Sequence, residues 1–253
     1  MYRQRPALCA ALPHGRVPRG SPEGARVARQ ETVTGSAEVA ARLAVAIHEH
    51  RLAPGTKLNE DEVGEIFGVS RTVVRAGLQQ LAHQHLVELK RNRGAFVARP
   101  GVREAREVFE ARSLLEPTTA RSAARRAGPA DIAALRDHIE AEHAALAAGD
   151  DGRALHLSGT FHNEVARIAN QGTIAEFIAQ LVSRSSLIIA LYWERRAALC
   201  ESHAHHALIA ALERNDEAEA EALMKSHLLD LYTSLDLRDT PPAPRTLKEA
   251  LDG

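Results

Sequence analysis

Residues 59–97 read NEDEVGEIFGVSRTVVRAGLQQLAHQHLVELKRNRGAFV, and this stretch decides the fold of the first third of the chain. Its first apolar side chains recur at helical spacing behind three acidic residues, which predicts a short helix with one buried face. That face consists of Val63, Ile66 and Phe67. Gly68 follows where helices commonly end in a left-handed residue, a conformation that glycine adopts without strain.

A second helix is expected to begin just after Ser70, because the serine hydroxyl can cap the first turn. Its apolar face is formed by Val74, Leu78 and Leu81, and its outward side carries Arg71, Thr72, Arg75 and Gln79. Two short helices joined by a tight glycine-containing turn are typical of a helix-turn-helix, whose second helix enters the major groove of DNA.

The next residues predict a small β-wing. Residues 86–89 and 95–97 have the composition of two strands, and residues 90–94 form a basic turn between them. Cations at such a tip suit contact with phosphate or the minor groove. Because these cations belong to a complete motif, the pattern favours DNA binding over a merely solvated basic surface.

The same stretch resembles the winged-helix domain of GntR-family transcription regulators. The matching residues are Pro54-Gly55, Leu58, Gly68 to Arg71, Val74-Arg75, Leu78, Leu81, Arg93-Gly94 and Phe96-Val97. The resemblance implies that Arg71 and Arg75 contact the DNA backbone or guanine edges and that Thr72 contacts phosphate. It also implies that Gly94 lets the wing tip approach the minor groove. The other expected DNA-binding residues are Ser70, Arg93 and Arg42.

Asp61 departs from the family, because some members carry at this position an arginine that touches DNA. That contact is expected to be missing here. Whether Arg42, on the preceding helix, replaces it is left open by the sequence.

Composition divides the chain into a basic head and an acidic body. Residues 1–100 hold 15 Lys and Arg against 9 Asp and Glu, whereas residues 101–253 hold 17 against 24. Nucleic-acid binding is therefore expected in the head alone. The two cysteines show no paired spacing, which is typical of a reducing cytoplasm, and no membrane span or signal peptide is expected.

We expect a mainly α-helical protein with four segments. These are a disordered basic arm (1–34), a winged helix-turn-helix domain (35–99), an all-helical effector-binding and dimerisation domain (102–237) and a flexible tail (238–253). Glycines, prolines and acidic caps divide the helical domain into six expected helices. Their spans are 104–127, 129–148, 151–169, 173–199, 201–214 and 216–237.

Three of the 13 histidines can be distinguished by their context. His162 lies at the edge of an apolar stripe, and His205 and His227 stand about ten residues on either side of the turn between the last two expected helices. Antiparallel packing can bring the latter two to one level, where imidazoles from separate helices can bind a divalent metal such as zinc. Packed or exposed histidines without a metal are the alternative.

The body resembles the FCD effector domain of the FadR-type branch of GntR regulators. The matching segments are EARSLLEPTTARSAA, FHNEVARIANQ and HHALIAALERNDEAEAEALMKSHL. The family's metal ligands, an Asp, a His four residues later and two further histidines, fall here on Ser158, His162, His205 and His227. His205 fits the family spacing better than His206.

Two residues of the body are candidates for effector binding. Ser158 departs from this pattern, because a neutral hydroxyl is a poor replacement for a carboxylate ligand, and a water molecule or an effector carboxylate could complete the shell around the three histidines. Arg112 matches a family arginine near the ligand cavity and could hold a carboxylate, with a surface ion pair as the alternative.

These features predict a ligand-responsive transcription regulator. It is expected to act as a repressor and to bind an operator in double-stranded DNA as a homodimer, under the control of a small carboxylic acid. The alternative is a metal-dependent hydrolase fused to a DNA-binding head, although no convincing general base accompanies the histidines. An architectural DNA-binding protein with an apolar, metal-free body cavity is the third candidate.

Overall fold

The computed structural model describes residues 35–193 and 199–238. The expected disordered arm (1–34) and all but the first residue of the expected flexible tail (238–253) lie outside the described residues. The described residues are mainly helical, with a small β-sheet near the N-terminal end, so the expected fold class is confirmed.

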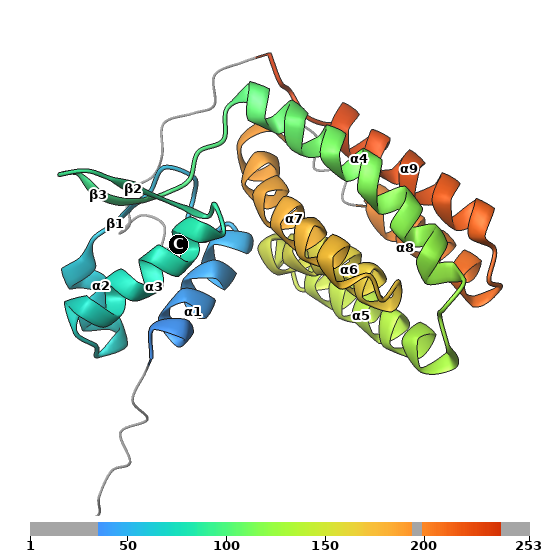
Figure 1. Ribbon diagram of the computed structural model, residues 1–253, viewed down its shortest axis with the longest axis horizontal. Coiled ribbons are helices and arrows are strands. Elements are labelled where there is room, and N and C mark those ends of the chain that lie inside the picture. The colour runs from blue at the N-terminus through green and yellow to red at the C-terminus, as the bar shows by residue number, and fades with distance from the viewer. Residues whose placement is uncertain (1–34, 194–198, 239–253) are drawn as a thin grey trace, which may run out of the picture. The chain divides into compact units, whose positions relative to one another are not determined.

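The N-terminal part is a winged helix-turn-helix (Figure 1). Its elements in chain order are α1 (Ser36–His48), β1 (Lys57–Leu58), α2 (Glu60–Phe67), α3 (Arg71–His83), β2 (Val87–Lys90) and β3 (Gly94–Val97). The strands form an antiparallel sheet in the order β1-β3-β2. The sequence indicated the two wing strands but not β1, because two residues are too few to show an alternating pattern.

Local capping explains where α2 and α3 begin and end. Asn59 Oδ1 accepts a hydrogen bond of 3.0 Å from the backbone N–H of Asp61, and Gly68 ends α2 with a φ of 66°. Ser70 Oγ then accepts from the backbone N–H of Val73 at 3.5 Å, as expected for the cap of α3.

The buried face of α2 differs in part from the expected one. Val63 is buried, but the side chain of Ile66 is 54% exposed. The prediction for Ile66 was therefore wrong. Helical spacing identifies a face only to within its edges, and α2 is short enough that one buried valine and the partly buried Phe67 cover its contact with the core.

The described part of the body contains six helices, as the sequence predicted. They are α4 (Val102–Ala124), α5 (Pro129–Ala147), α6 (Asp151–Ile168), α7 (Gly172–Tyr192), α8 (Leu199–Glu213) and α9 (Glu217–Thr233). Figure 1 shows α4 beside α9 and α6 between α5 and α7, and the packing contacts agree. The predicted end of α7 at Leu199 was wrong, because Trp193 adopts an extended conformation and bridges to Leu235.

The core of the body is built mainly from alanine and branched aliphatic side chains, with few aromatic ones. Phe109 and Phe161 are its fully buried phenylalanines among the described residues. Among the described helices, α7 alone is long and apolar enough to cross a membrane by these two criteria. In this fold, α7 packs against α4 and α6, as expected for a helix of a bundle.

Candidate metal centre and DNA interface

Three histidines from three helices meet inside the helical body. His162 on α6, His205 on α8 and His227 on α9 are 3%, 1% and 5% exposed. Each offers one ring nitrogen to a group of donor atoms that all lie within 4.8 Å of one another. The structure thus brings together the three histidines that the sequence singled out, and the cluster could hold a metal ion.

The protonation state of His162 leaves one of its nitrogens available as a ligand. Its Nδ1 lies 2.6 Å from Oε2 of Glu116. Burial, opposed by Glu116, lowers the pKa of His162 to about 4, so the ring is neutral near pH 7. Because a carboxylate can only accept, the proton must lie on Nδ1, and Nε2 presents its lone pair to the cluster.

Glu116 is held in its charged form inside the protein. Burial alone would raise its pKa, but the Arg112 guanidinium and His162 outweigh that effect and lower the pKa to about 2. Arg112 Nε donates to Glu116 Oε1 at 2.5 Å, and Arg112 Nη1 donates to Ser185 Oγ at 2.9 Å. The charged pair is therefore compensated by hydrogen bonds, as buried charges require.

His205 carries the clearest sign of a ligand site. Both of its ring nitrogens are buried, and neither has a hydrogen-bond partner among the residues that the structure describes. Oε2 of Glu142, on α5, likewise has no hydrogen bond among the described residues, and it lies 3.5 Å from His205 Nδ1, at the outer range of an ion pair. Unsatisfied buried polar atoms destabilise a fold by about 1–3 kcal/mol each, so an additional bound partner is the natural explanation.

The spacing of two of the histidines fits a tetrahedral metal. His162 Nε2 and His227 Nε2 lie 3.3 Å apart. Zinc–nitrogen bonds of about 2.0–2.1 Å at tetrahedral angles place two nitrogens roughly 3.3–3.4 Å apart. Burial is the largest of the effects that lower the pKa of His227, and the nearby His205 and His162 lower it further. This ring therefore also favours its neutral, ligating form. These residues therefore fit a zinc-like ion.

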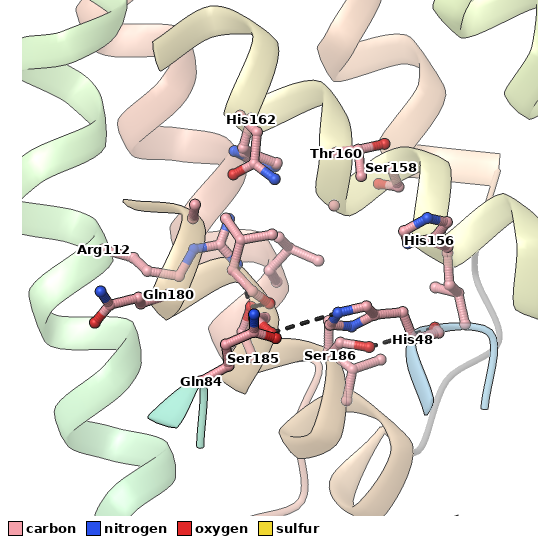
Figure 2. A pocket seen from close by; sticks show the side chains of 18 of the residues that line it. His48, Gln84, Arg112, His156, Ser158, Thr160, His162, Gln180, Ser185 and Ser186 are labelled. Carbon is pink, nitrogen blue, oxygen red and sulfur yellow. Dashed lines mark hydrogen bonds between the residues drawn. The ribbon is translucent and has the colours of Figure 1, made fainter. Parts of the chain in front are cut away.

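A pocket of about 450 Å³ adjoins the cluster. His162, Arg112, Ser158 and Ser185 are among its lining residues, with Arg112 and His162 on one side and His156 on the other in the view of Figure 2. The lining combines these polar side chains with a larger apolar area. Both candidate effector residues, Arg112 and Ser158, thus lie beside the histidine cluster.

Of the two alternatives for Arg112, the structure excludes the surface ion pair. It is 2% exposed, so its ion pair with Glu116 is not a surface pair. It lines the pocket, yet its charge is already balanced by Glu116. Two of its five N–H groups remain outside the hydrogen bonds to Glu116 and Ser185.

The outward side of α3 carries the cations that the sequence assigned to DNA. Arg71 and Arg75 are largely exposed, and each pairs with a carboxylate of α2. Arg71 Nε contacts Asp61, and Arg75 Nε lies 2.7 Å from Glu60 Oε2. Asp61 thus pairs with Arg71 instead of contributing a cation of its own.

The other expected DNA-binding residues lie on α1, at the start of α3 and on the wing. Ser70 and Thr72 are exposed at the N-terminal end of α3. At the wing, Gly94 has a φ of 93°, a backbone conformation that favours glycine. Two arginines rest on aromatic rings. The guanidinium of Arg42 is 4.6 Å from the centroid of Phe67, and that of Arg93 is 6.0 Å from the centroid of Phe96.

Sequence reasoning missed the two carboxylates of the buried site. Glu116 could have been found, since it stands four residues after Arg112 on one expected helix and so shares its face. Glu142 gave no such signal, because its partner His205 comes from a distant part of the chain.

A winged helix-turn-helix followed by a helical body with a pocket beside a buried histidine cluster is the architecture of a DNA-binding transcription regulator. Comparison with known families supports this class, because residues 36–97 match the model of bacterial regulatory proteins of the gntR family. Residues 107–230 match the FCD domain. The chain belongs to the GntR family and carries the C-terminal FCD domain of its FadR-type branch.

Curated relatives of this chain are transcription regulators and not enzymes. The Nta operon transcriptional regulator of Aminobacter aminovorans is 27% identical over 180 residues, which cover 70% of this chain and 83% of the relative. The Uxu operon transcriptional regulator of Escherichia coli K12 is 29% identical over 217 residues, which cover 76% and 82%. The HTH-type transcriptional repressor RspR of the same strain is 25% identical over 187 residues, which cover 73% and 81%.

Solved structures share the fold. The E. coli protein McbR/YncC is similar with a TM-score of 0.70 and 23% identity, over 78% of this chain and 95% of that protein. A GntR regulator from Rhodococcus sp. RHA1 is similar with a TM-score of 0.69 and 24% identity, over 78% and 95%.

Proposed function

We propose that this protein is a cytoplasmic, ligand-responsive repressor that binds operator DNA as a homodimer. Residues 35–99 would bind DNA through Arg42, Ser70, Arg71, Thr72, Arg75, Arg93 and Gly94, and residues 102–237 would bind the effector. The match to the gntR family supports the DNA-binding part. Repression as the direction of control is supported by the relative RspR, which is named a transcriptional repressor.

The buried histidines would hold a divalent metal such as zinc. The observation that carries this assignment is the pair of unpartnered, buried ring nitrogens of His205 beside His162 and His227. A bound ion would supply a Lewis acid that accepts an electron pair from a ligand oxygen. Glu116 keeps the proton of His162 on Nδ1 and so fixes this ring in the ligating tautomer.

The effector would be a small carboxylic acid that enters the pocket beside the histidines. Since Ser158 provides no carboxylate, a carboxylate from the effector can serve as the anionic ligand that the three neutral histidines lack. The remaining N–H donors of Arg112 line the same pocket and can donate to it. The site would then distinguish anionic ligands from neutral ones.

A homodimer would place two recognition helices on a palindromic operator. Large apolar side chains that remain exposed on the helical body support a self-association face. They are Leu114 on α4, Phe177 on α7 and Leu229 on α9. The effector would change the operator affinity by shifting the population of DNA-competent dimers.

The buried site is tested by metal analysis of the full chain purified without chelators or a polyhistidine tag. Wild type and His83→Ala, which changes an exposed histidine of α3, should each carry about one equivalent of metal in this site. His162→Ala should lose that equivalent. Retention of the full metal content in His162→Ala, or metal-free wild-type protein, would contradict the assignment.

The regulatory function is tested by footprinting on the DNA upstream of the protein's own gene, with and without a panel of small carboxylic acids. A protected site whose occupancy falls when one acid is added is the expected result. Protection that no acid changes would contradict control by this class of effector. The absence of any protection at that DNA would argue against autoregulation through this operator.

A further inference from the structure

A second group of potential metal ligands lies on the outside of the helical body, apart from the buried cluster. Glu140 and His143 are on α5, and His206 is on α8. Their donor atoms, one from each side chain, all lie within 4.8 Å of one another. Glu140 and His206 are exposed and His143 is half-buried, so an ion could reach all three from solvent.

The helix geometry explains why these side chains converge. Glu140 and His143 are three residues apart on α5 and therefore share a face of that helix. Helix α8 packs against α5, and His206 meets His143 with ring centroids 5.2 Å apart and an interplanar angle of 19°. A carboxylate and a histidine three residues apart, completed by a ligand from a neighbouring helix, is a pattern of ligands that helical bundles use for metals.

From this arrangement we propose that Glu140, His143 and His206 form a second divalent transition-metal site. Two imidazole nitrogens and one carboxylate oxygen suit zinc, nickel or copper(II) better than calcium or magnesium. The donors of a tetrahedral site lie roughly 3.3–3.4 Å apart, and the exposed side chains of Glu140 and His206 can close the remaining distance by rotation. Water would fill the open coordination positions.

The site joins the two helices next to the buried cluster. The neighbours of its ligands in the chain, Glu142 on α5 and His205 on α8, point inward and face each other at 3.5 Å. An ion held by His143 and His206 would therefore cross-link α5 to α8 at the level at which α8 presents His205. Because such an ion binds the folded state and not the unfolded one, it would also stabilise this part of the body.

The proposal is tested with Zn²⁺ on the full chain, without a polyhistidine tag and after removal of bound metal with a chelator. Isothermal titration should give one more bound equivalent for wild type than for His143→Ala or His206→Ala. This difference does not depend on the occupancy of the buried cluster. All three ligands lie on the surface or near it, so the variants should keep the circular dichroism spectrum of wild type.

Two controls complete the test. His83→Ala removes an exposed histidine from α3 and should keep every equivalent that wild type binds. Glu140→Gln should weaken the affected equivalent but retain it, since both imidazoles remain. The proposal would be overturned if His143→Ala and His206→Ala kept the wild-type stoichiometry. It would also be overturned if the control His83→Ala lost one equivalent of bound zinc.

Discussion

Glu60 and Arg75 join α2 to α3 through an ion pair in which Glu60 Oε2 lies 2.7 Å from Arg75 Nε. Asp61 pairs with Arg71 in the same way. The two arginines of α3 that we propose for DNA contact, Arg71 and Arg75, therefore each face a carboxylate when DNA is absent. Exposed pairs of this kind contribute only about 0–1 kcal/mol, so a phosphate or a guanine edge can displace the carboxylate.

Asp61→Asn should strengthen DNA binding. The substitution releases Arg71 and removes a negative charge next to the expected path of the phosphates, which should lower the Kd about twofold to fivefold, or by on the order of 0.5–1 kcal/mol. Fluorescence anisotropy with labelled operator DNA at fixed salt measures the effect. Glu65→Gln, at the other end of α2, is the matched control. Binding by Asp61→Asn that is no tighter than by this control would show that Asp61 does not oppose DNA.

Arg75→Ala should weaken operator binding in one of two distinguishable ways. Loss of a base contact costs about 1–3 kcal/mol and relaxes specificity at one position, whereas loss of a phosphate contact reduces the salt slope by about 1. Titrations at several salt concentrations separate the two. Arg103→Ala removes an exposed arginine of α4 that pairs with Glu107, and it should leave both quantities unchanged. If Arg75→Ala behaves like this control, Arg75 does not touch DNA.

Glu142→Gln should weaken metal binding at the buried cluster without removing a proposed ligand. The carboxylate stands behind His205 Nδ1 at 3.5 Å, where it can orient the ring and accept its proton. Loss of such an outer partner typically reduces metal affinity about tenfold to a hundredfold. Competition with a chelator of known affinity measures the change, and Asp137→Asn on the exposed side of α5 is the control. Equal affinities of the two variants would mean that Glu142 has no such role.

The sequence predicted most helices because their ends are marked by local chemistry. Gly68 and Ser70 stand between α2 and α3, and Gly149 and Asp150 separate α5 from α6 in the same way. No local sequence signal of this kind indicated the end of α7. Trp193 leaves the helix to bridge Leu235, a contact between distant parts of the chain that no local pattern reveals.

The sequence likewise indicated only part of the candidate site. The family spacing was enough to bring His162, His205 and His227 forward from among 13 histidines. The carboxylates behind them are positioned by packing between helices, so the hydrogen bond from His162 to Glu116 required the three-dimensional structure. The same packing places Arg112, a candidate for effector binding, in a buried, charge-balanced network that the sequence did not indicate.

Asp131→Ala should make the helical body less stable above pH 4 but not in stronger acid. Asp131 Oδ2 accepts a hydrogen bond of 3.1 Å from the backbone N–H of Gly128 at the start of α5, and Oδ1 accepts one from Arg167 Nη2. Both bonds lower the pKa of Asp131 below its ordinary value of 3.8, and the bond from the backbone N–H has the larger effect. A depressed carboxyl pKa contributes stability above the unfolded value, and that stability is lost as the pH falls through the folded value.

The difference in unfolding free energy between wild type and Asp131→Ala should therefore be constant near neutral pH, at about 0.3–1.5 kcal/mol for a helix-capping contact. It should shrink as the pH falls below 3.8. Urea unfolding followed by circular dichroism at several pH values measures it. Asp137→Asn supplies the control, because this exposed carboxylate lies on the same helix without capping it. A difference that stayed constant down to the lowest pH would show that the contribution of Asp131 does not depend on its charge.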